Sequence, residues 1–222
     1  MRNTLLKEAV SVLGSVLDAL RASITATGED AADLHYAIGD LSASASARLI
    51  SGAAADDLSN CFDLATAAGA TLDTMRTVRE TVQDMSPSGK PGLIVQTFSV
   101  RLALVQEAAI LFASTLSSRD EVESLQDRFN TAFEAAENTA ADAMETETYR
   151  TLVELHAAVT RFLSTLSYTL PRIVKVTYPK SFPALTLAQR LYQDAGRASE
   201  LIAENKPMHP AFMPAALRAL SE

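Results

Sequence analysis

The sequence predicts a mainly helical protein, with an elongated helical bundle over residues 1–170 and a small α+β module over residues 171–222. Positions 93–170 contain neither proline nor glycine, whereas six of the eight prolines lie between Pro171 and Pro214. Because proline is excluded from helix interiors, the first part is free to form long helices and the second is not. Charge changes at the same place, from a net −11 before residue 171 to +3 after it. We therefore expect a domain boundary at Leu170–Pro171.

Apolar residues in the first part recur every three or four positions, the spacing that one buried helix face requires. The first stripe predicts a helix of about 22 residues, and the segment 27–30 then offers a cap to a second helix that stops near Gly52. A third predicted helix runs from Ala53 towards Met85, and Gly69 is a candidate break. The stripe residues are Leu6, Leu13, Leu17, Leu20 and Ile24, then Leu34, Ile38, Leu41, Ala45 and Leu49, then Leu58, Phe62, Ala65, Leu72, Met75, Val78 and Val82.

The segment 86–92 is rich in proline, glycine and serine and predicts a loop before the most apolar stretch, residues 93–116. Arg101 and Glu107 interrupt that stretch and leave uncharged runs of about ten residues, whereas a membrane span needs roughly 18. We expect a buried helix of a soluble protein here, and no membrane insertion. The N-terminus is interrupted early by Lys7 and Glu8, so no secretory signal is expected.

Two further helices are predicted before the boundary. Ser118 and Glu121 have the spacing of a capping box and should open a helix whose apolar face carries Val122, Leu125, Phe129, Phe133 and Ala136. The last helix covers about 146–169 and carries Leu152, Leu155, Val159, Phe162 and Leu166. The pattern leaves open whether residues 138–146 bend or continue straight.

The last part of the chain predicts the order strand, helix, helix, strand. Alternating β-branched residues over 172–177 indicate a strand, and Leu185, Ala188, Leu191 and Tyr192 form the stripe of a following helix. A second short helix carries Ala198, Leu201 and Ile202 and should close at Asn205, because asparagine tolerates left-handed geometry. Residues 209–214 are expected to be extended before prolines, and 216–220 to return as a strand beside the first.

Few residues are available for catalysis. The chain has three histidines, one cysteine and no tryptophan, and no histidine pair has the spacing of a helical zinc site. Cys61 lies on an alanine-rich predicted helix, where a small core residue is the simplest interpretation. Gly-x-Ser-x-Gly, Walker and Gly-x-Gly-x-x-Gly motifs are absent from the sequence. We therefore expect no enzyme activity, no cofactor, no metal site and no small-molecule substrate.

The charge distribution argues against a nucleic-acid-binding helical part. Net charge is −8, and residues 119–150 carry nine acidic against three basic side chains. That run is interpreted as a solvated helix face in preference to a site for a basic partner, and either surface would repel phosphates.

The strand–helix–helix–strand order resembles the LysM module. More specifically, residues 187–205 followed by His209–Pro214, together with Leu170–Pro171 before the strand, resemble the C-terminal end of the Mu-like phage DNA circularisation proteins. Departures from that family are Gln193 in place of a glycine, Ala215–Ala216 in place of a glycine-rich turn, and a chain that begins directly in helices where the family has a further N-terminal domain.

The resemblance implies a structural component of a contractile phage tail, at the baseplate or hub, made in the bacterial host cytoplasm. Its partners would be other tail subunits. The family name proposes DNA-end binding, and LysM modules elsewhere bind peptidoglycan, so both remain alternatives. With few basic residues, contact with phosphates should be weak. The residues that match the family pattern, and so are candidates for partner contact or for holding the module together, are Arg190, Tyr192, Asp194, Arg197, Asn205, His209 and Pro210.

For these residues the sequence also suggests internal roles. Arg190 could pair with Asp194 along one helix face, and Arg197 with Glu200. Tyr192 can bury its ring and expose its hydroxyl.

Overall fold

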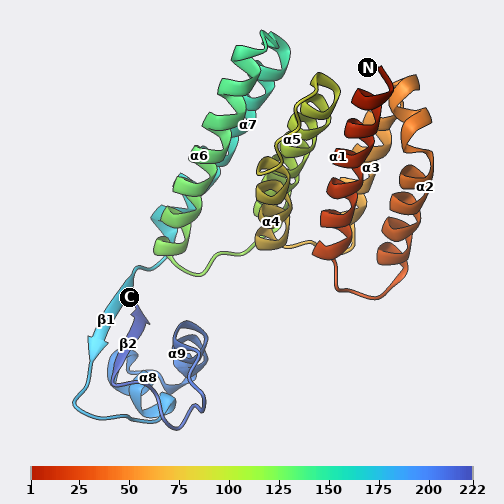
Figure 1. Ribbon diagram of the computed structural model, residues 1–222. Helices are drawn as coiled ribbons and strands as arrows, with labels where there is room; N and C mark the ends of the chain where they lie inside the picture. The colour runs from red at the N-terminus through yellow and green to blue at the C-terminus, as the bar shows by residue number, and fades with distance from the viewer. Residues whose placement is uncertain (1, 222) are drawn as a thin grey trace. The chain divides into compact units, whose positions relative to one another are not determined.

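The computed structural model describes residues 2–221 and confirms a mainly helical chain that ends in a small α+β module (Figure 1). A run of helices precedes the first strand: α1 (Arg2–Ser23), α2 (Glu29–Ser51), α3 (Ala54–Ala67), α4 (Leu72–Gln83), α5 (Lys90–Ala113), α6 (Arg119–Asp142) and α7 (Thr146–Thr169). The module follows as β1 (Ile173–Thr177), α8 (Ala184–Tyr192), a 3-10 turn (Ala195–Arg197), α9 (Ala198–Asn205) and β2 (Ala216–Leu220).

The chain divides into two compact units. The first comprises residues 1–114 and 132–152, and the second comprises residues 115–131 and 153–222. The division therefore cuts through α6 and α7. The boundary predicted at 170–171 falls at the junction between α7 and β1.

Helices α1 to α5 form the core of the first unit. Helix α1 contacts α2, α3, α4 and α5, and its predicted stripe is almost wholly buried. Phe62 of α3 and Met75 of α4 are also completely buried within this core. Apolar side chains at helical spacing thus account for the packing of this unit, because each helix has one continuous face to remove from water.

The predicted breaks at Gly52 and Gly69 are confirmed, whereas the predicted cap of α2 is not. Gly52 and Gly69 have φ values of 84° and 91°, so both sit in the left-handed region where helices α2 and α3 end. Gly28 occupies the N-cap of α2 and has no side chain to accept a hydrogen bond, so the expected side-chain cap is absent. Glu29 and Asp30 in the first turn instead complement the helix dipole.

Helix α5 begins at Lys90, inside the segment predicted as a loop, because Pro91 fits the first turn of a helix. Its start is held by α1: the Glu8 carboxylate accepts hydrogen bonds from the Ser88 backbone N–H at 2.6 Å and hydroxyl at 2.9 Å. A Cβ atom at Gly89 would overlap a Glu8 carboxylate oxygen and the Leu5 side chain. A larger residue at position 89 would therefore require the Glu8 and Leu5 side chains to move.

Helix α5 carries both apolar and ionic groups into the core. Its Glu107 accepts a hydrogen bond from Arg79 of α4 at 2.6 Å, and both side chains are buried. Among the described helices α5 is also long and apolar enough to cross a membrane by length and composition alone, a test that core helices of soluble proteins pass too. In the structure α5 packs against α1, α3 and α4.

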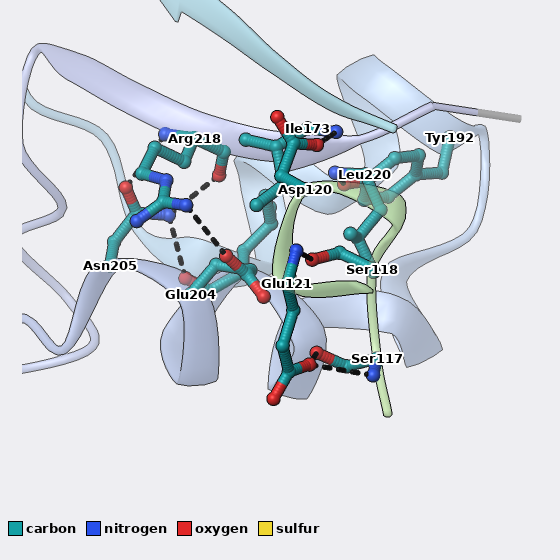
Figure 2. Close-up of polar contacts among 11 residues, drawn as sticks. Ser117, Ser118, Asp120, Glu121, Ile173, Tyr192, Glu204, Asn205, Arg218 and Leu220 are labelled. Carbon is teal, nitrogen blue, oxygen red and sulfur yellow. Dashed lines mark hydrogen bonds and ion pairs between the residues drawn. The ribbon is translucent and has the colours of Figure 1, made fainter. Parts of the chain in front are cut away.

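The predicted start of α6 is confirmed in a modified form. Ser118 accepts from the Glu121 N–H at 3.2 Å, but the Glu121 carboxylate reaches back to Ser117 rather than to Ser118 (Figure 2). Residues 143–145 form a bend between α6 and α7, with Met144 at a φ of 57°. In α7, Leu152 and Val159 of the predicted stripe are buried, whereas Leu155, Phe162 and Leu166 are half-buried. Leu163, which was not predicted, is also completely buried.

Acid should weaken the contact between α1 and the start of α5. The hydrogen bonds from the Ser88 backbone and hydroxyl lower the pKa of Glu8 below its ordinary value. The stabilisation of the fold by ionised Glu8 is therefore complete above the ordinary pKa of glutamate and is lost as pH falls through the lowered pKa. Urea-unfolding midpoints at about pH 3 and about pH 6 should differ less in Glu8→Gln than in the parent chain. The exposed Glu134→Gln serves as control, and equal acid sensitivity of Glu8→Gln and parent would contradict the assignment.

Cys61 should be inert in the folded chain. Its side chain is completely buried, and burial raises the pKa of the thiol to about 11. Because the thiolate is the reactive species, a thiol reagent at neutral pH should label Cys61 at the rate at which the protein unfolds. Labelling at the rate of a small free thiol would contradict its placement in the core.

Candidate functional site: the C-terminal module

The two strands of the module pair antiparallel, with Lys175 opposite Arg218. Directly opposite residues share a face, so Val174, Val176, Leu217 and Ala219 form one face of the sheet. Leu217 and Ala219 are buried against residues of α8 and α9, and Met213 completes this small core. The other face carries Lys175 and Arg218. The sheet therefore has one face covered by helices and one cationic face that those helices leave open.

Asn205 has a structural role that differs from its predicted one. It does not close α9 in left-handed geometry, since Lys206 takes that conformation with φ 41°. The Asn205 carboxamide instead accepts from the Arg218 N–H at 2.7 Å and donates to the Arg218 carbonyl at 2.7 Å (Figure 2). It also donates to the Leu201 carbonyl at 2.8 Å. One side chain thus makes the two hydrogen bonds that a neighbouring strand would make to β2.

Tyr192 continues the same edge. Its hydroxyl accepts a hydrogen bond from the Leu220 N–H at 3.0 Å, so the prediction that it would point to solvent is wrong (Figure 2). Burial raises the pKa of this phenol. The Arg197 guanidinium lies 3.9 Å from the Tyr192 ring centre and also binds Glu200 at 2.8 Å, as its helical spacing predicted. Together these contacts fix α8 and α9 along β2.

Arg190 and Asp194 act separately instead of forming the expected pair. The Arg190 guanidinium lies 4.4 Å from the centre of the Phe182 ring, and Tyr178 meets that ring edge-on at 5.8 Å. The Asp194 carboxylate accepts from the Gly196 N–H at 2.8 Å and so begins the 3-10 turn. Gln193, where the resembled family has glycine, sits at a φ of 56°.

Residues 209–212 form a turn, whereas the sequence predicted an extended segment over 209–214. The Phe212 N–H donates to the His209 carbonyl at 3.0 Å, and His209 Nδ1 accepts from the Ala211 N–H at 3.1 Å. Pro210 uses its carbonyl to accept from the Ala184 N–H at 2.8 Å, which holds the start of α8. This contact and the His209 side chain favour a turn. They therefore outweigh the preference of residues before proline for an extended conformation.

Three large apolar side chains point outward from this part of the module. Leu185 is 63% exposed, Phe212 is 73% exposed and Met208 is fully exposed. They lie on the start of α8 and on residues 206–213, two segments joined by the hydrogen bonds from Ala184 to Pro210 and from Met213 to Phe182. We call these three residues the apolar tip. Leu185 was predicted to be buried, but Leu187 takes the inward position of α8.

The outer edge of β1 is the second exposed feature. Backbone groups of Ile173, Lys175 and Thr177 point away from β2, because Val174 and Val176 form the hydrogen-bonded pairs of the ladder. The Ile173 N–H donates to the Asp120 carboxylate at 2.7 Å (Figure 2). Within residues 2–221 the outward groups of Lys175 and Thr177 have no hydrogen-bond partner. β1 therefore keeps an open edge, whereas side chains occupy that of β2.

The first unit, residues 1–114 and 132–152, holds a mainly apolar cavity of about 500 Å³. Leu13, Leu58 and Phe98 line it, with Arg101 and Glu145 forming an ion pair at its wall. None of the predicted site residues lies there. Within residues 2–221 no cluster of three or more histidine, cysteine, aspartate or glutamate side chains is placed to hold a metal ion.

Comparison with protein-family models and with curated proteins finds no match for this chain. The seven predicted residues organise the module, and the exposed features are the apolar tip and the β1 edge. Sequence spacing predicted neither the apolar tip nor the β1 edge. One signal for the tip can be found in the sequence, because Leu185 lies one position away from Ala184 in the buried stripe of α8.

Asn205→Ala should destabilise the module by about 1–2 kcal/mol, because it removes three hydrogen bonds and leaves the Arg218 N–H and carbonyl to water. Urea unfolding measured by Tyr fluorescence would quantify the loss. Glu204→Gln is the neighbouring control, since its contact with Arg218 is a 4.0 Å ion pair that contributes less than about 0.5 kcal/mol. Equal effects of the two substitutions would show that the carboxamide does not bind β2.

Proposed function

We propose that this chain is a structural subunit of a contractile phage tail, in the baseplate or hub region, that docks onto neighbouring subunits through its C-terminal module. The observation that carries the proposal is the apolar tip. Exposed apolar groups gathered on one part of a protein mark interaction sites more often than single exposed side chains do. The tail assignment itself rests on the resemblance of residues 187–214 to the Mu-like circularisation proteins.

The internal bonding of the module supports a docking role. Asn205, Tyr192, Asp194 and His209 hold backbone groups of the module, so the segments that carry the tip are tied at several points. A rigid surface loses less conformational entropy when a partner binds. The tip residues themselves have no such structural task, since Leu185, Met208 and Phe212 are exposed.

Binding of DNA ends is a second candidate, favoured by the exposed cations of the module. Arg172, Lys175 and Lys180 are exposed and the module carries a net +3 charge. Arg172 lies 3.9 Å from Glu123, so part of this charge is already compensated. Few phosphate contacts give weak, strongly salt-dependent binding. A band shift at low salt would support this candidate, and its absence there would reject it.

The tail proposal is tested by substituting the tip. The double variant Leu185→Ser, Phe212→Ser should co-purify with tail particles from the encoding host at least about tenfold less than the parent, because two apolar anchors are lost. Its unfolding free energy should stay within about 0.5 kcal/mol, since both side chains are exposed.

Tyr36→Ser is the matched control, an exposed aromatic on α2 with 79% exposure and no place in the module. It should leave incorporation unchanged. Parent chain absent from tail particles would overturn the proposed function. Normal incorporation of the double variant would remove the apolar tip from it.

A further inference from the structure

We infer that the outer edge of β1 is the site where an extended, acidic segment of a partner protein adds as a third strand. The inference rests on the proposed docking function and names the chemistry of the partner. Strand addition uses backbone hydrogen bonds for affinity and alternate side chains for specificity.

The first step is the asymmetry between the two edges. At β2 the N–H groups of Arg218 and Leu220 and the Arg218 carbonyl are bound by Asn205 and Tyr192. On the outward side of β1, the Ile173 N–H is the one group that another of residues 2–221 binds, with Asp120 as the acceptor. The N–H and carbonyl of both Lys175 and Thr177 remain open on an exposed strand. A new strand can therefore extend this sheet only beside β1.

The second step is the partly exposed apolar surface that Val174 and Val176 form beside that edge. Val174 lies on the helix-covered face of the sheet but is 46% exposed, so the helices do not cover β1 fully. Side chains of an added strand that point to this face would continue the layer of Val174 and Val176. An apolar residue at alternate positions of the partner is thus favoured.

The third step is charge. Lys175 and Arg218 stand directly opposite at a non-hydrogen-bonded pair, where side chains are closest and like charges destabilise. Arg218 has Glu204 at 4.0 Å, whereas the Lys175 ammonium has no acidic partner within residues 2–221. A carboxylate on an added strand, opposite Lys175 on the open face, would supply that partner. In the antiparallel register centred on Lys175, pairing of β1 with a second copy would instead place two Lys175 residues opposite each other, which is unfavourable.

The test uses the full chain and a synthetic fluorescent peptide, Thr-Val-Glu-Val-Glu-Val-Thr, in a low-salt anisotropy titration. The expected result is saturable binding that a peptide with lysine in place of glutamate does not show. Lys175→Gln should weaken binding about two- to fivefold, as expected for one exposed ion pair. Thr177→Pro should weaken it about fivefold or more, because it removes an outward N–H while leaving the ladder to β2 intact.

Val10→Thr, a partly buried position on α1, controls for non-specific effects and should bind as the parent does. Each variant must retain the parent's unfolding midpoint. If one of the β1 variants has a lower unfolding midpoint, the parent chain is used instead. Hydrogen exchange of its Lys175 and Thr177 amides is then measured with and without peptide, and slower exchange with peptide supports strand addition.

Three results would overturn the inference. These are no saturable peptide binding, binding that Thr177→Pro leaves unchanged, and a short DNA duplex that binds through Lys175 while the acidic peptide does not. None of them would remove the chain from tail particles, so failure of strand addition is distinguishable from failure of the proposed function.

Discussion

The C-terminal module depends on two side chains that make the backbone hydrogen bonds a third strand would make to β2. A two-stranded sheet is marginal in water and needs a packed face to persist. Here the Asn205 carboxamide and the Tyr192 hydroxyl bind the outward backbone groups of β2, while Leu217 and Ala219 are buried against α8 and α9. Edge and face are thus held by the same two helices. Without these bonds, β2 would have an unpaired edge and α9 would be held to β2 mainly by the packing of Ala198 and Leu201.

This arrangement decides which surfaces are left for partners. Because β2 is occupied, β1 alone offers open backbone groups, and Asp120 limits even those to the part of the strand beyond Ile173. The apolar tip lies on segments that Ala184, Pro210 and Met213 tie together through backbone hydrogen bonds. A docking module needs this combination of rigid support and exposed contact groups, since ordering costs reduce affinity.

The first unit is held together mainly by apolar packing between helices. Its five helices α1 to α5 bury continuous apolar stripes, and its specific polar contacts are local adjustments to that packing. Glu8 holds the start of α5, and Arg79 with Glu107 forms an ion pair inside the core. Removing one partner of such a buried pair is costly, because it leaves a charge without compensation.

Much of the fold could be predicted because helical and strand periods are local properties. The stripes of α1 to α4 and of α6, the end of α2 at Gly52 and both strands are examples. The errors have tertiary causes. Leu185 and Leu187 both fit α8 patterns, and only the sheet decides which one is buried.

The candidate site was less predictable than the fold. Asn205 pairs with a strand thirteen residues later, which no local preference for left-handed geometry indicates. The turn at 209–212 depends on His209 Nδ1 accepting from Ala211 and on Pro210 binding Ala184. The predicted residues all lie in the module, and the contacts described for them are made within it. The open edge of β1 requires knowledge of strand register, which composition does not supply.

Native-state hydrogen exchange of individual backbone amides in the isolated chain tests the central claim most directly. Exchange at Arg218 and Leu220 should be as slow as at Leu217 in the middle of the ladder, because Asn205 and Tyr192 bind their N–H groups. Exchange at Lys175 and Thr177 should be fast. Fast exchange at Arg218, or slow exchange at Lys175 without a partner, would contradict a module closed at β2 and open at β1.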